Sequence, residues 1–271
     1  MRKLALITGA SAGIGRAFAC AYAQAGFDLA LVARREKRLR DISADLTSHF
    51  DIETIGIPAD LSRDNSVSQI LDELTRADRH VDVLVNNAGF GLPGLYTEQS
   101  WEAQRDFIQL MFTSPAELCH RVLPGMQTRG YGRIINIASL VSFTPGSKGH
   151  TLYGPVKAGL MRLSESLNAE ARGTGVHVTA LCPGLTLSEF HDVNGQRERV
   201  SKLPGFMWQT SERVAELGIK AVEKNRPVIV TGLVNKALAG LAQTLPGPLA
   251  RSVMNAQSNR FRKGDENASG Q

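Results

Sequence analysis

A tyrosine and a lysine four residues apart are the side chains of this sequence best suited to act together chemically. Tyr153 and Lys157 precede a segment, 158–167, whose apolar residues recur with a helical period. Positions i and i+4 share one face of a helix, so the ammonium is predicted to lie beside the phenol. A phenol titrates at about pH 10, and a neighbouring cation favours its ionised form. The pair is a candidate for proton exchange, although this spacing also occurs on solvated helix faces.

The composition fits one large α/β domain and excludes several function classes. The chain has 271 residues, 42% hydrophobic and 21% charged, as in globular proteins. A net charge of +5 favours a small phosphorylated ligand over nucleic acid. Three scattered cysteines predict reduced thiols in the cytoplasm, and the six histidines show no metal-ligand spacing. Because no uncharged run reaches about 18 residues, we expect no membrane partner.

A glycine-rich turn near the start of the chain is a candidate phosphate-binding loop. It follows an apolar run, 3–8, that predicts a buried strand, and it precedes a helical segment, 16–25. Glycines let the backbone approach a pyrophosphate, and the positive helix end favours the anion. The spacing departs from the usual dinucleotide fingerprint, because three residues separate the first two glycines. The predicted cofactor-binding residues are Gly9, Ser11, Ala12, Gly13, Ile14 and Gly15.

The end of the second predicted strand, 28–33, indicates which dinucleotide would bind. An acidic residue at this place binds the ribose hydroxyls of NAD, whereas an arginine accommodates the 2′-phosphate of NADP. This chain has Ala33 there, followed by Arg34. A repelling carboxylate is absent and a bidentate donor is present, so the sequence predicts NADP(H). The alternative is that Arg34 and Arg35 simply begin the charged face of the next helix.

Strands and helices alternate along the rest of the chain. The sequence therefore predicts an α/β, doubly wound Rossmann fold: a single domain with a parallel sheet of about seven strands and helices on both faces. Ligands in such sheets bind beyond the carboxyl ends of the strands. This rule places the glycine-rich turn, Arg34, Asp60 and residues 87–89 around one crevice. The further predicted strands are 52–58, 81–85, 132–139, 176–181 and 228–230, and the further predicted helices are 36–48, 66–77, 101–127 with a kink at Pro115, 153 to about 173, and 211–224.

Residues 1–262 are predicted to form this dinucleotide-binding and catalytic domain. Residues 187–210 are irregular and polar, which predicts a lid over the site. A proline-interrupted helical region is expected over about 233–262, followed by a disordered tail at 263–271.

The order of the motifs resembles the short-chain dehydrogenase/reductase family over about residues 3 to 232, and the C-terminal part resembles a bacterial, NADP(H)-dependent branch. The motifs are Thr8-Gly9-x3-Gly13-Ile14-Gly15, Asn86-Asn87-Ala88-Gly89, Ser139, Tyr153-x3-Lys157 and Pro183-Gly184-x-Thr186. The resemblance implies an oxidoreductase that transfers hydride between nicotinamide and a carbonyl or alcohol substrate. It also implies a homodimer or homotetramer.

The resemblance implies a role for each matched residue. Tyr153 would be the acid in carbonyl reduction and the base in alcohol oxidation. Lys157 would bind the nicotinamide ribose and depress the pKa of Tyr153. Ser139 would hydrogen-bond the substrate oxygen as it gains negative charge. Further cofactor contacts are implied for Asp60, Leu61, Asn87, Ala88, Gly89, Pro183, Gly184 and Thr186, with Thr186 on the carboxamide.

The chain departs from the family pattern at two places. Where the family has an asparagine in its long helix, this chain has Met111, whose thioether cannot hold a water as an amide does. Thr113 or Ser114 could substitute. The alternative function is therefore a catalytically weak NADP-binding sensor or scaffold on the same fold.

The second departure is that Ser139 lies one residue further from Tyr153 than the family spacing. The strict spacing would select Leu140, which has no suitable chemistry, and Ser142 is the reserve candidate.

Overall fold

Seven parallel strands form the central sheet of the computed structural model, which describes residues 1–92, 94–146, 149, 151–187, 205 and 208–244. The strand order is β3-β2-β1-β4-β5-β6-β9, so the chain winds outward from β1 in both directions. The predicted doubly wound α/β fold is confirmed. The strands are β1 (Leu4–Thr8), β2 (Asp28–Ala33), β3 (Thr54–Pro58), β4 (Val83–Asn86), β5 (Gly132–Ile137), β6 (Val176–Cys182) and β9 (Val228–Val230).

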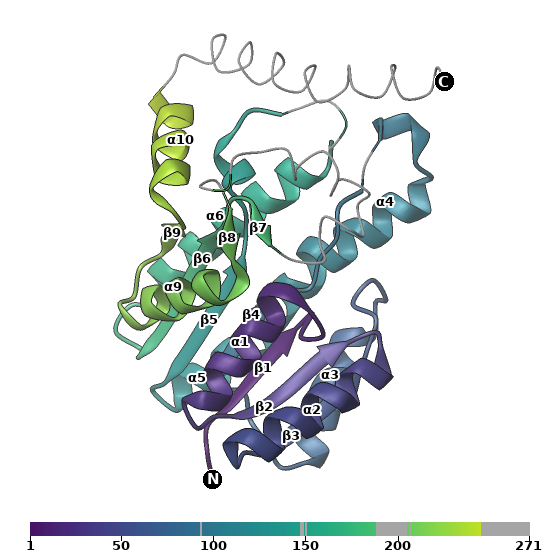
Figure 1. Cartoon of the computed structure of the whole chain (residues 1–271), viewed down its shortest axis with the longest axis vertical. Coiled ribbons are helices and arrows are strands. Elements are labelled where there is room, and N and C mark those ends of the chain that lie inside the picture. Colours follow the sequence, from purple (N-terminus) through teal and green to yellow (C-terminus); the bar gives the residue numbers. More distant parts are fainter. Residues whose placement is uncertain (93, 147–148, 150, 188–204, 206–207, 245–271) are drawn as a thin grey trace.

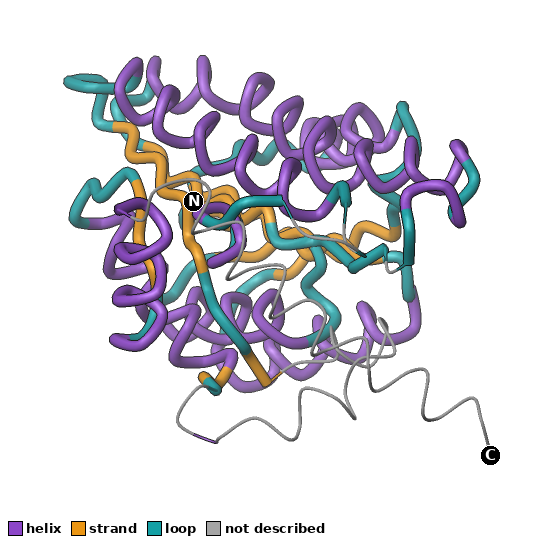
Figure 2. The backbone as a smooth tube through the Cα atoms, turned by 90° about the horizontal axis from the view of Figure 1, so that it is seen from above, coloured by secondary structure: helices purple, strands orange, loops and turns teal. Residues whose placement is uncertain are grey.

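Helices cover both faces of this sheet (Figure 1, Figure 2). One face packs against α1 (Gly13–Gln24), α2 (Glu36–Phe50) and α9 (Ser211–Glu223). The other packs against α3 (Ser66–Arg76), α4 (Trp101–Ile108), α5 (Ser114–Thr128) and α6 (Tyr153–Glu170). A last helix, α10 (Leu233–Thr244), follows the edge strand β9.

The central strands are mainly apolar because both of their faces are buried. In β1, Leu4 and Leu6 belong to one hydrophobic core, while Ala5 and Ile7 belong to the core on the opposite face. Successive side chains of a strand point to opposite faces, so a continuous apolar run serves two cores at once. This burial is what fixes the carboxyl ends of the strands in one row.

The predicted helix over 101–127 is interrupted where the sequence placed a kink. A π-helical turn, Gln109–Thr113, separates α4 from α5, and Pro115 lies in the first turn of α5. Proline has no N–H, so it cannot donate to the carbonyl four residues before it, and a wider turn accommodates this loss. The kink therefore precedes Pro115 and carries Met111.

Only the ends of the predicted lid lie within the described residues. There β7 (Thr186–Leu187) pairs in parallel with β8 (Gln209–Thr210), a short sheet that the sequence did not predict. Residues 188–204, 206–207 and 245–271 lie outside the described residues, so the lid, the rest of the C-terminal helical region and the tail stay predictions. No helix in the described ranges is both long and apolar enough to cross a membrane.

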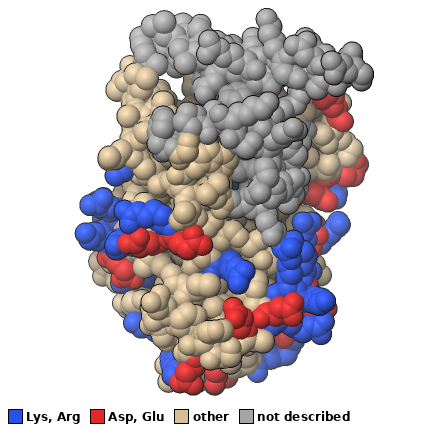
Figure 3. Space-filling view, in the orientation of Figure 1, with Lys and Arg blue, Asp and Glu red and all other residues tan. Residues whose placement is uncertain are grey.

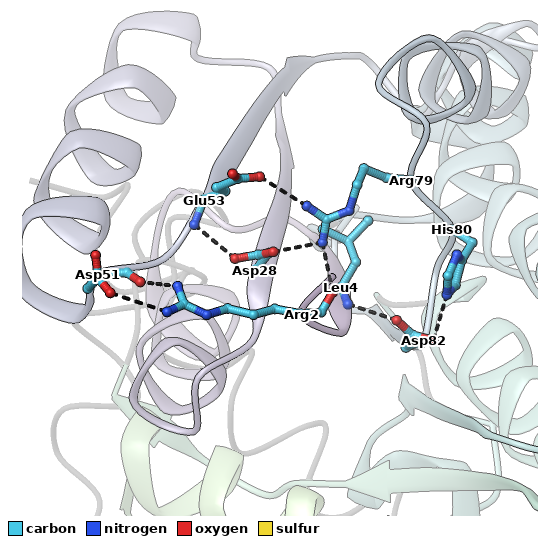
Figure 4. A network of polar contacts seen from close by, with 8 residues as sticks. All are labelled: Arg2, Leu4, Asp28, Asp51, Glu53, Arg79, His80 and Asp82. Atoms are coloured by element: carbon cyan, nitrogen blue, oxygen red, sulfur yellow. Dashed lines mark hydrogen bonds and ion pairs between the residues drawn. The ribbon is translucent and has the colours of Figure 1, made fainter.

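A network of charged groups holds the amino ends of the strands together (Figure 4). The carboxylate of Asp28 accepts hydrogen bonds from Arg79 at 2.8 Å and from the Glu53 N–H at 2.9 Å. The Leu4 N–H donates to Asp82 at 2.9 Å. The side chains of Asp28 and Arg79 are only 5% and 6% exposed, so removal of Arg79 would leave the buried Asp28 carboxylate without its cation, whereas removal of Asp28 would leave Arg79 paired with Glu53 alone. The network stabilises the amino ends of the strands, which lie opposite the carboxyl ends that carry the motifs.

Candidate active site

The turn from β1 to α1 depends on its glycines, of which Gly9 and Gly13 have positive φ. Gly9 has φ +66°, a left-handed conformation that side chains rarely adopt. A Cβ on Gly15 would lie 2.3 Å from the carbonyl oxygen of Gly9. Ala12 precedes α1 and offers no side-chain acceptor to the N–H groups of the first helical turn. Such N–H groups bind anions, so Ser11 to Ile14 form a suitable cradle for a pyrophosphate.

The loop after β4 is tied to this turn by Asn87. Its amide nitrogen donates to the carbonyls of Thr8 at 3.0 Å and Gly9 at 3.2 Å. The N–H groups of Asn87 and Ala88 both donate to the Thr8 hydroxyl, at 2.9 and 3.0 Å. Gly89 faces Met111, because a Cβ there would lie 2.8 Å from the Met111 sulfur. The structure thus brings together the motifs at residues 9–15 and 87–89, as predicted.

Two arginines and an aspartate follow the neighbouring strands β2 and β3. Arg34 is exposed, and within the described residues it has no hydrogen bond or ion pair. Arg35 reaches back to the glycine-rich turn and donates to the Ser11 hydroxyl at 3.1 Å. The Asp60 carboxylate accepts from the backbone and hydroxyl of Ser62, at 3.1 and 2.9 Å. Next to it, Leu61 is buried. Both arginines therefore border the crevice, which the sequence predicted for Arg34 alone.

Tyr153 and Lys157 stack on one face of α6, as their spacing predicts. The Lys157 ammonium lies 5.9 Å from the centre of the Tyr153 ring and donates to the Ile137 carbonyl at 2.6 Å. This bond ties the start of α6 to the carboxyl end of β5. Ser139 lies just beyond that strand, in extended backbone that begins a short 3₁₀ turn.

The pKa of Tyr153 is shifted in the direction opposite to the one expected from the sequence. Tyr153 keeps some solvent exposure, yet the surrounding protein desolvates its hydroxyl and raises its pKa to about 12. A hydrogen bond with the Ser139 side chain lowers the pKa but does not reverse the shift. Burial also lowers the pKa of Lys157 to about 8. The expected depression of the Tyr153 pKa below its ordinary value is therefore not found, because burial sets the direction of the shift and the Lys157 ammonium, 5.9 Å from the ring centre, does not reverse it.

The contacts of Tyr153 show which of the three candidate positions, 139, 140 or 142, lies beside it. Ser139 hydrogen-bonds Tyr153, whereas Leu140 has no polar side chain to offer. The Ser142 hydroxyl is buried without a partner in the described part of the chain. The structure therefore brings Ser139, one residue off the strict spacing, to the tyrosine.

The loop after β6 closes the other side of the crevice. The Leu140 N–H donates to the Pro183 carbonyl at 2.9 Å, and the Thr186 hydroxyl donates to the Gly184 carbonyl at 3.2 Å. A Cβ on Gly184 would lie 2.3 Å from the Asn235 amide nitrogen, so α10 packs directly on this loop. Thr186 is 5% exposed.

The sequence pattern that describes short chain dehydrogenases matches residues 3–199. The chain belongs to this family. Its members are oxidoreductases, and the resemblance seen in the motifs is confirmed.

Individual members of the family are similar over most of the chain. Sulfoacetaldehyde reductase 2 of Chromohalobacter salexigens is 34% identical over 70% of this chain and 75% of its own length. A short-chain dehydrogenase from Sphingobium yanoikuyae in complex with NADPH is 30% identical, with a TM-score of 0.78 over 90% of this chain and 96% of that one. A family structure from Burkholderia phymatum in complex with NAD is 25% identical, with a TM-score of 0.80 over 89% and 92%.

The family departure at Met111 lies in the π-helical turn. Met111 is 1% exposed and packs in the main core. Two side chains were expected to substitute for the family asparagine. Ser114 is fully buried and donates to the Leu61 carbonyl at 2.7 Å, and Thr113 is exposed whereas Lys157 is buried. The Ser114 hydroxyl is thus already engaged, and a role for either hydroxyl beside the lysine stays a prediction.

A buried polar cluster beneath the site escaped the sequence analysis. The side chain of Asn136, on β5, accepts from Asn86 of β4 at 2.8 Å and donates to Ser164 of α6 at 2.9 Å. It therefore ties the helix that carries Tyr153 to two central strands. The signal was available, because Asn136 follows two apolar residues and precedes another in the strand, where a buried amide needs partners.

Proposed function

We propose that this short-chain dehydrogenase is an NADP(H)-dependent oxidoreductase that interconverts a carbonyl compound and an alcohol, with Tyr153 as the acid and base. One observation carries the proposal: Tyr153, hydrogen-bonded to Ser139, shares a helix face with Lys157. The NADPH complex and the aldehyde reductase among its relatives support the cofactor and the substrate class, although another relative binds NAD.

The residues at the carboxyl ends of the strands fit a dinucleotide. The close-packed turn at Gly9 and Gly15 leaves backbone N–H groups for the pyrophosphate, and Arg34 is available for a 2′-phosphate. Thr186, which follows β6, would hold the carboxamide. When bound, the cofactor supplies or accepts the hydride.

The protein's own contribution is proton transfer and charge stabilisation. In reduction, the Tyr153 hydroxyl donates its proton to the substrate oxygen, and the Ser139 hydroxyl donates a hydrogen bond to that same oxygen as it becomes negative. The nearby Lys157 cation stabilises the tyrosinate that remains.

A screen of NADPH oxidation against aldehydes and ketones tests this function. We expect at least one carbonyl class to be turned over, in a reaction that Tyr153→Phe eliminates. If NADPH binds but no carbonyl or alcohol is converted with either cofactor, the protein is instead a dinucleotide sensor.

The cofactor preference is expected to depend on Arg34. NADPH should bind at least about tenfold more tightly than NADH, or about 1.4 kcal/mol. Arg34→Ala should remove most of this preference, because the guanidinium no longer meets the 2′-phosphate. Arg40→Ala, on the exposed face of α2 and paired with Glu36, is the matched control and should leave it unchanged. Equal affinity of the wild type for both cofactors, measured by titration calorimetry, would show the assignment to be wrong.

Met111 favours a second candidate, a binding protein without efficient turnover. We expect the protein to be an enzyme and not such a binding protein. Pro115 cannot donate to the Met111 carbonyl, so this main-chain oxygen lacks its usual α-helical donor and is our candidate for holding a water near the lysine.

Met111→Asn should therefore change kcat by less than about tenfold. Turnover is measured at saturating NADPH, with Met111→Leu as the control for packing alone. A several-hundredfold higher kcat in Met111→Asn, but not in Met111→Leu, would contradict the role of the Met111 carbonyl and support the sensor function.

A further inference from the structure

The loop that follows β6, residues 183–186, is held in place by backbone contacts from two other strands. Just after β9, the Thr231 N–H donates to the carbonyl of Cys182, the last residue of β6, at 3.3 Å. On β8, the Gln209 N–H donates to the Leu185 carbonyl at 3.0 Å. Both ends of the loop are therefore fixed to parts of the chain that follow it in sequence.

Three polar side chains meet at the turn between β9 and α10. The Thr231 hydroxyl donates to the side-chain carbonyl of Gln209, and the Asn235 amide donates to the Thr231 carbonyl at 2.8 Å. Between them, Gly232 has φ +82°, and a Cβ there would lie 3.3 Å from the amide nitrogen of Gln209 and from that of Asn235. We call Gln209, Thr231 and Asn235 the turn cluster.

The turn cluster contacts the loop at Gly184 and at Thr186. A Cβ on Gly184 would lie 2.3 to 2.6 Å from three atoms of the Asn235 amide group, so this amide packs directly against the loop backbone. Gln209 is the partner of Thr186 in the pairing of β8 with β7. The Thr186 hydroxyl in turn donates to the Gly184 carbonyl at 3.2 Å. A shift of either contact would therefore move Thr186.

The cluster consists of neutral groups that are shielded from solvent. Thr231 and Asn235 are 0% and 5% exposed, and Gln209 is half-buried. In Figure 1, β8, β9 and α10 lie at the same end of the molecule, and Figure 3 shows mainly uncharged surface over α10. Buried hydrogen bonds between neutral groups rigidify the segments that they join and are little affected by salt.

We propose that the turn cluster positions Thr186 for the nicotinamide carboxamide, so that α10 helps to align the nicotinamide ring with the substrate. The inference rests on the proposed function, which assigns the carboxamide to Thr186. The three side chains of the cluster act through the loop, so they are positioning residues. Their effect on the rate is expected to be large, because a misplacement of about 1 Å can cost about 100-fold in rate.

A comparison of two ligands tests the inference. NADPH contains the nicotinamide, whereas 2′-phospho-ADP-ribose lacks it, so the ratio of their affinities reports on the nicotinamide end alone. Asn235→Leu keeps the size of the side chain and removes its amide. It should lower this ratio by at least about fivefold, the equivalent of one hydrogen bond, and kcat by about tenfold or more. The affinity for 2′-phospho-ADP-ribose, measured by titration calorimetry, should stay within about twofold.

A second pair of variants tests the hydroxyl of the cluster. Thr231→Val keeps the shape of the side chain but cannot donate to Gln209, so it should lower the affinity ratio and kcat in the same direction. Thr231→Ser restores the donor and should restore both quantities. A serine variant as impaired as the valine variant would show that this hydrogen bond does not position the loop.

Asn168→Leu is the matched control. Asn168 is also 5% exposed, and its amide donates to the Val178 carbonyl at 2.9 Å and to the Asn225 side chain at 2.7 Å, towards the amino end of β6. Its replacement should cost stability, measured by urea unfolding, without changing the affinity ratio or kcat.

Two results would overturn the inference. One is an equal loss of affinity for NADPH and for 2′-phospho-ADP-ribose in Asn235→Leu, or no loss of either. The other is a fall of the affinity ratio in Asn168→Leu as large as that in Asn235→Leu, which would show a general effect of destabilisation. A wild type without turnover would contradict the proposed function alone, because the affinity ratio is measured without any reaction.

Discussion

Tyr153→Phe is expected to lower kcat by about 10²–10⁴-fold while leaving the affinity for NADPH within about threefold. The substitution removes one hydroxyl, which is the proton donor, and keeps the ring, which packs against the main hydrophobic core. Its partner Ser139 keeps its own backbone contact, since the Ser139 hydroxyl also accepts from the Val141 N–H at 3.4 Å. Chemistry should therefore be lost without loss of the binding site.

The measurement compares NADPH turnover with NADPH binding for the same preparations. Tyr131→Phe is the control, because Tyr131 precedes β5 at the opposite end of the sheet, where its ring packs against Lys3 and Arg133. It should keep full activity. Near-normal turnover by Tyr153→Phe on a good substrate would show that another group is the acid.

Lys157→Met is expected to stabilise the cofactor-free protein at pH 7 while abolishing most of its activity. The pKa of Lys157 is about 8 in the folded protein, against an ordinary value of 10.5. Between pH 8 and pH 10.5 the unfolded chain binds more protons at this residue than the folded protein does. The contribution of Lys157 to the free energy of unfolding therefore rises with pH through that window. Below pH 8 the full cost of the buried cation is present, at most about 3 kcal/mol by the conversion of pKa to free energy.

The Lys157→Met variant removes the cost of burying the cation. It also loses the hydrogen bond from Lys157 to the Ile137 carbonyl, which offsets part of that gain. Its free energy of unfolding should exceed that of the wild type at pH 7, and the difference should shrink towards pH 10. Urea unfolding at the two pH values measures this. Lys220→Met, at an exposed cation on α9, is expected to show no such pH-dependent gain. A methionine variant less stable than the wild type at pH 7 would mean that the buried lysine is stabilising.

Local patterns were enough to predict the sheet. Strands such as β2 are apolar from Leu29 to Ala33 because they are buried on both faces, and the alternation with helices then dictates parallel pairing. Boundaries were less accurate where buried and half-buried residues adjoin, as at β3, which begins at Thr54 instead of residue 52. The two-stranded pairing of β7 with β8 joins segments that no local pattern relates.

The sequence by itself determined which side chains share a face or a turn. The four-residue spacing of Tyr153 and Lys157 and the glycines at 9 and 15 depend only on helix geometry and on backbone space, which are local properties. They predicted the pair and the turn that the structure contains.

Tertiary structure alone decided how these groups titrate and which neighbours they bind. The pKa of Tyr153 rises because atoms from several segments desolvate it, and the spacing to Lys157 contains no information about that. Likewise, Ser114 is engaged by Leu61 and Arg35 by Ser11, across long stretches of sequence. Desolvation and long-range hydrogen bonds depend on what the fold packs around a residue, so they follow only from the folded chain.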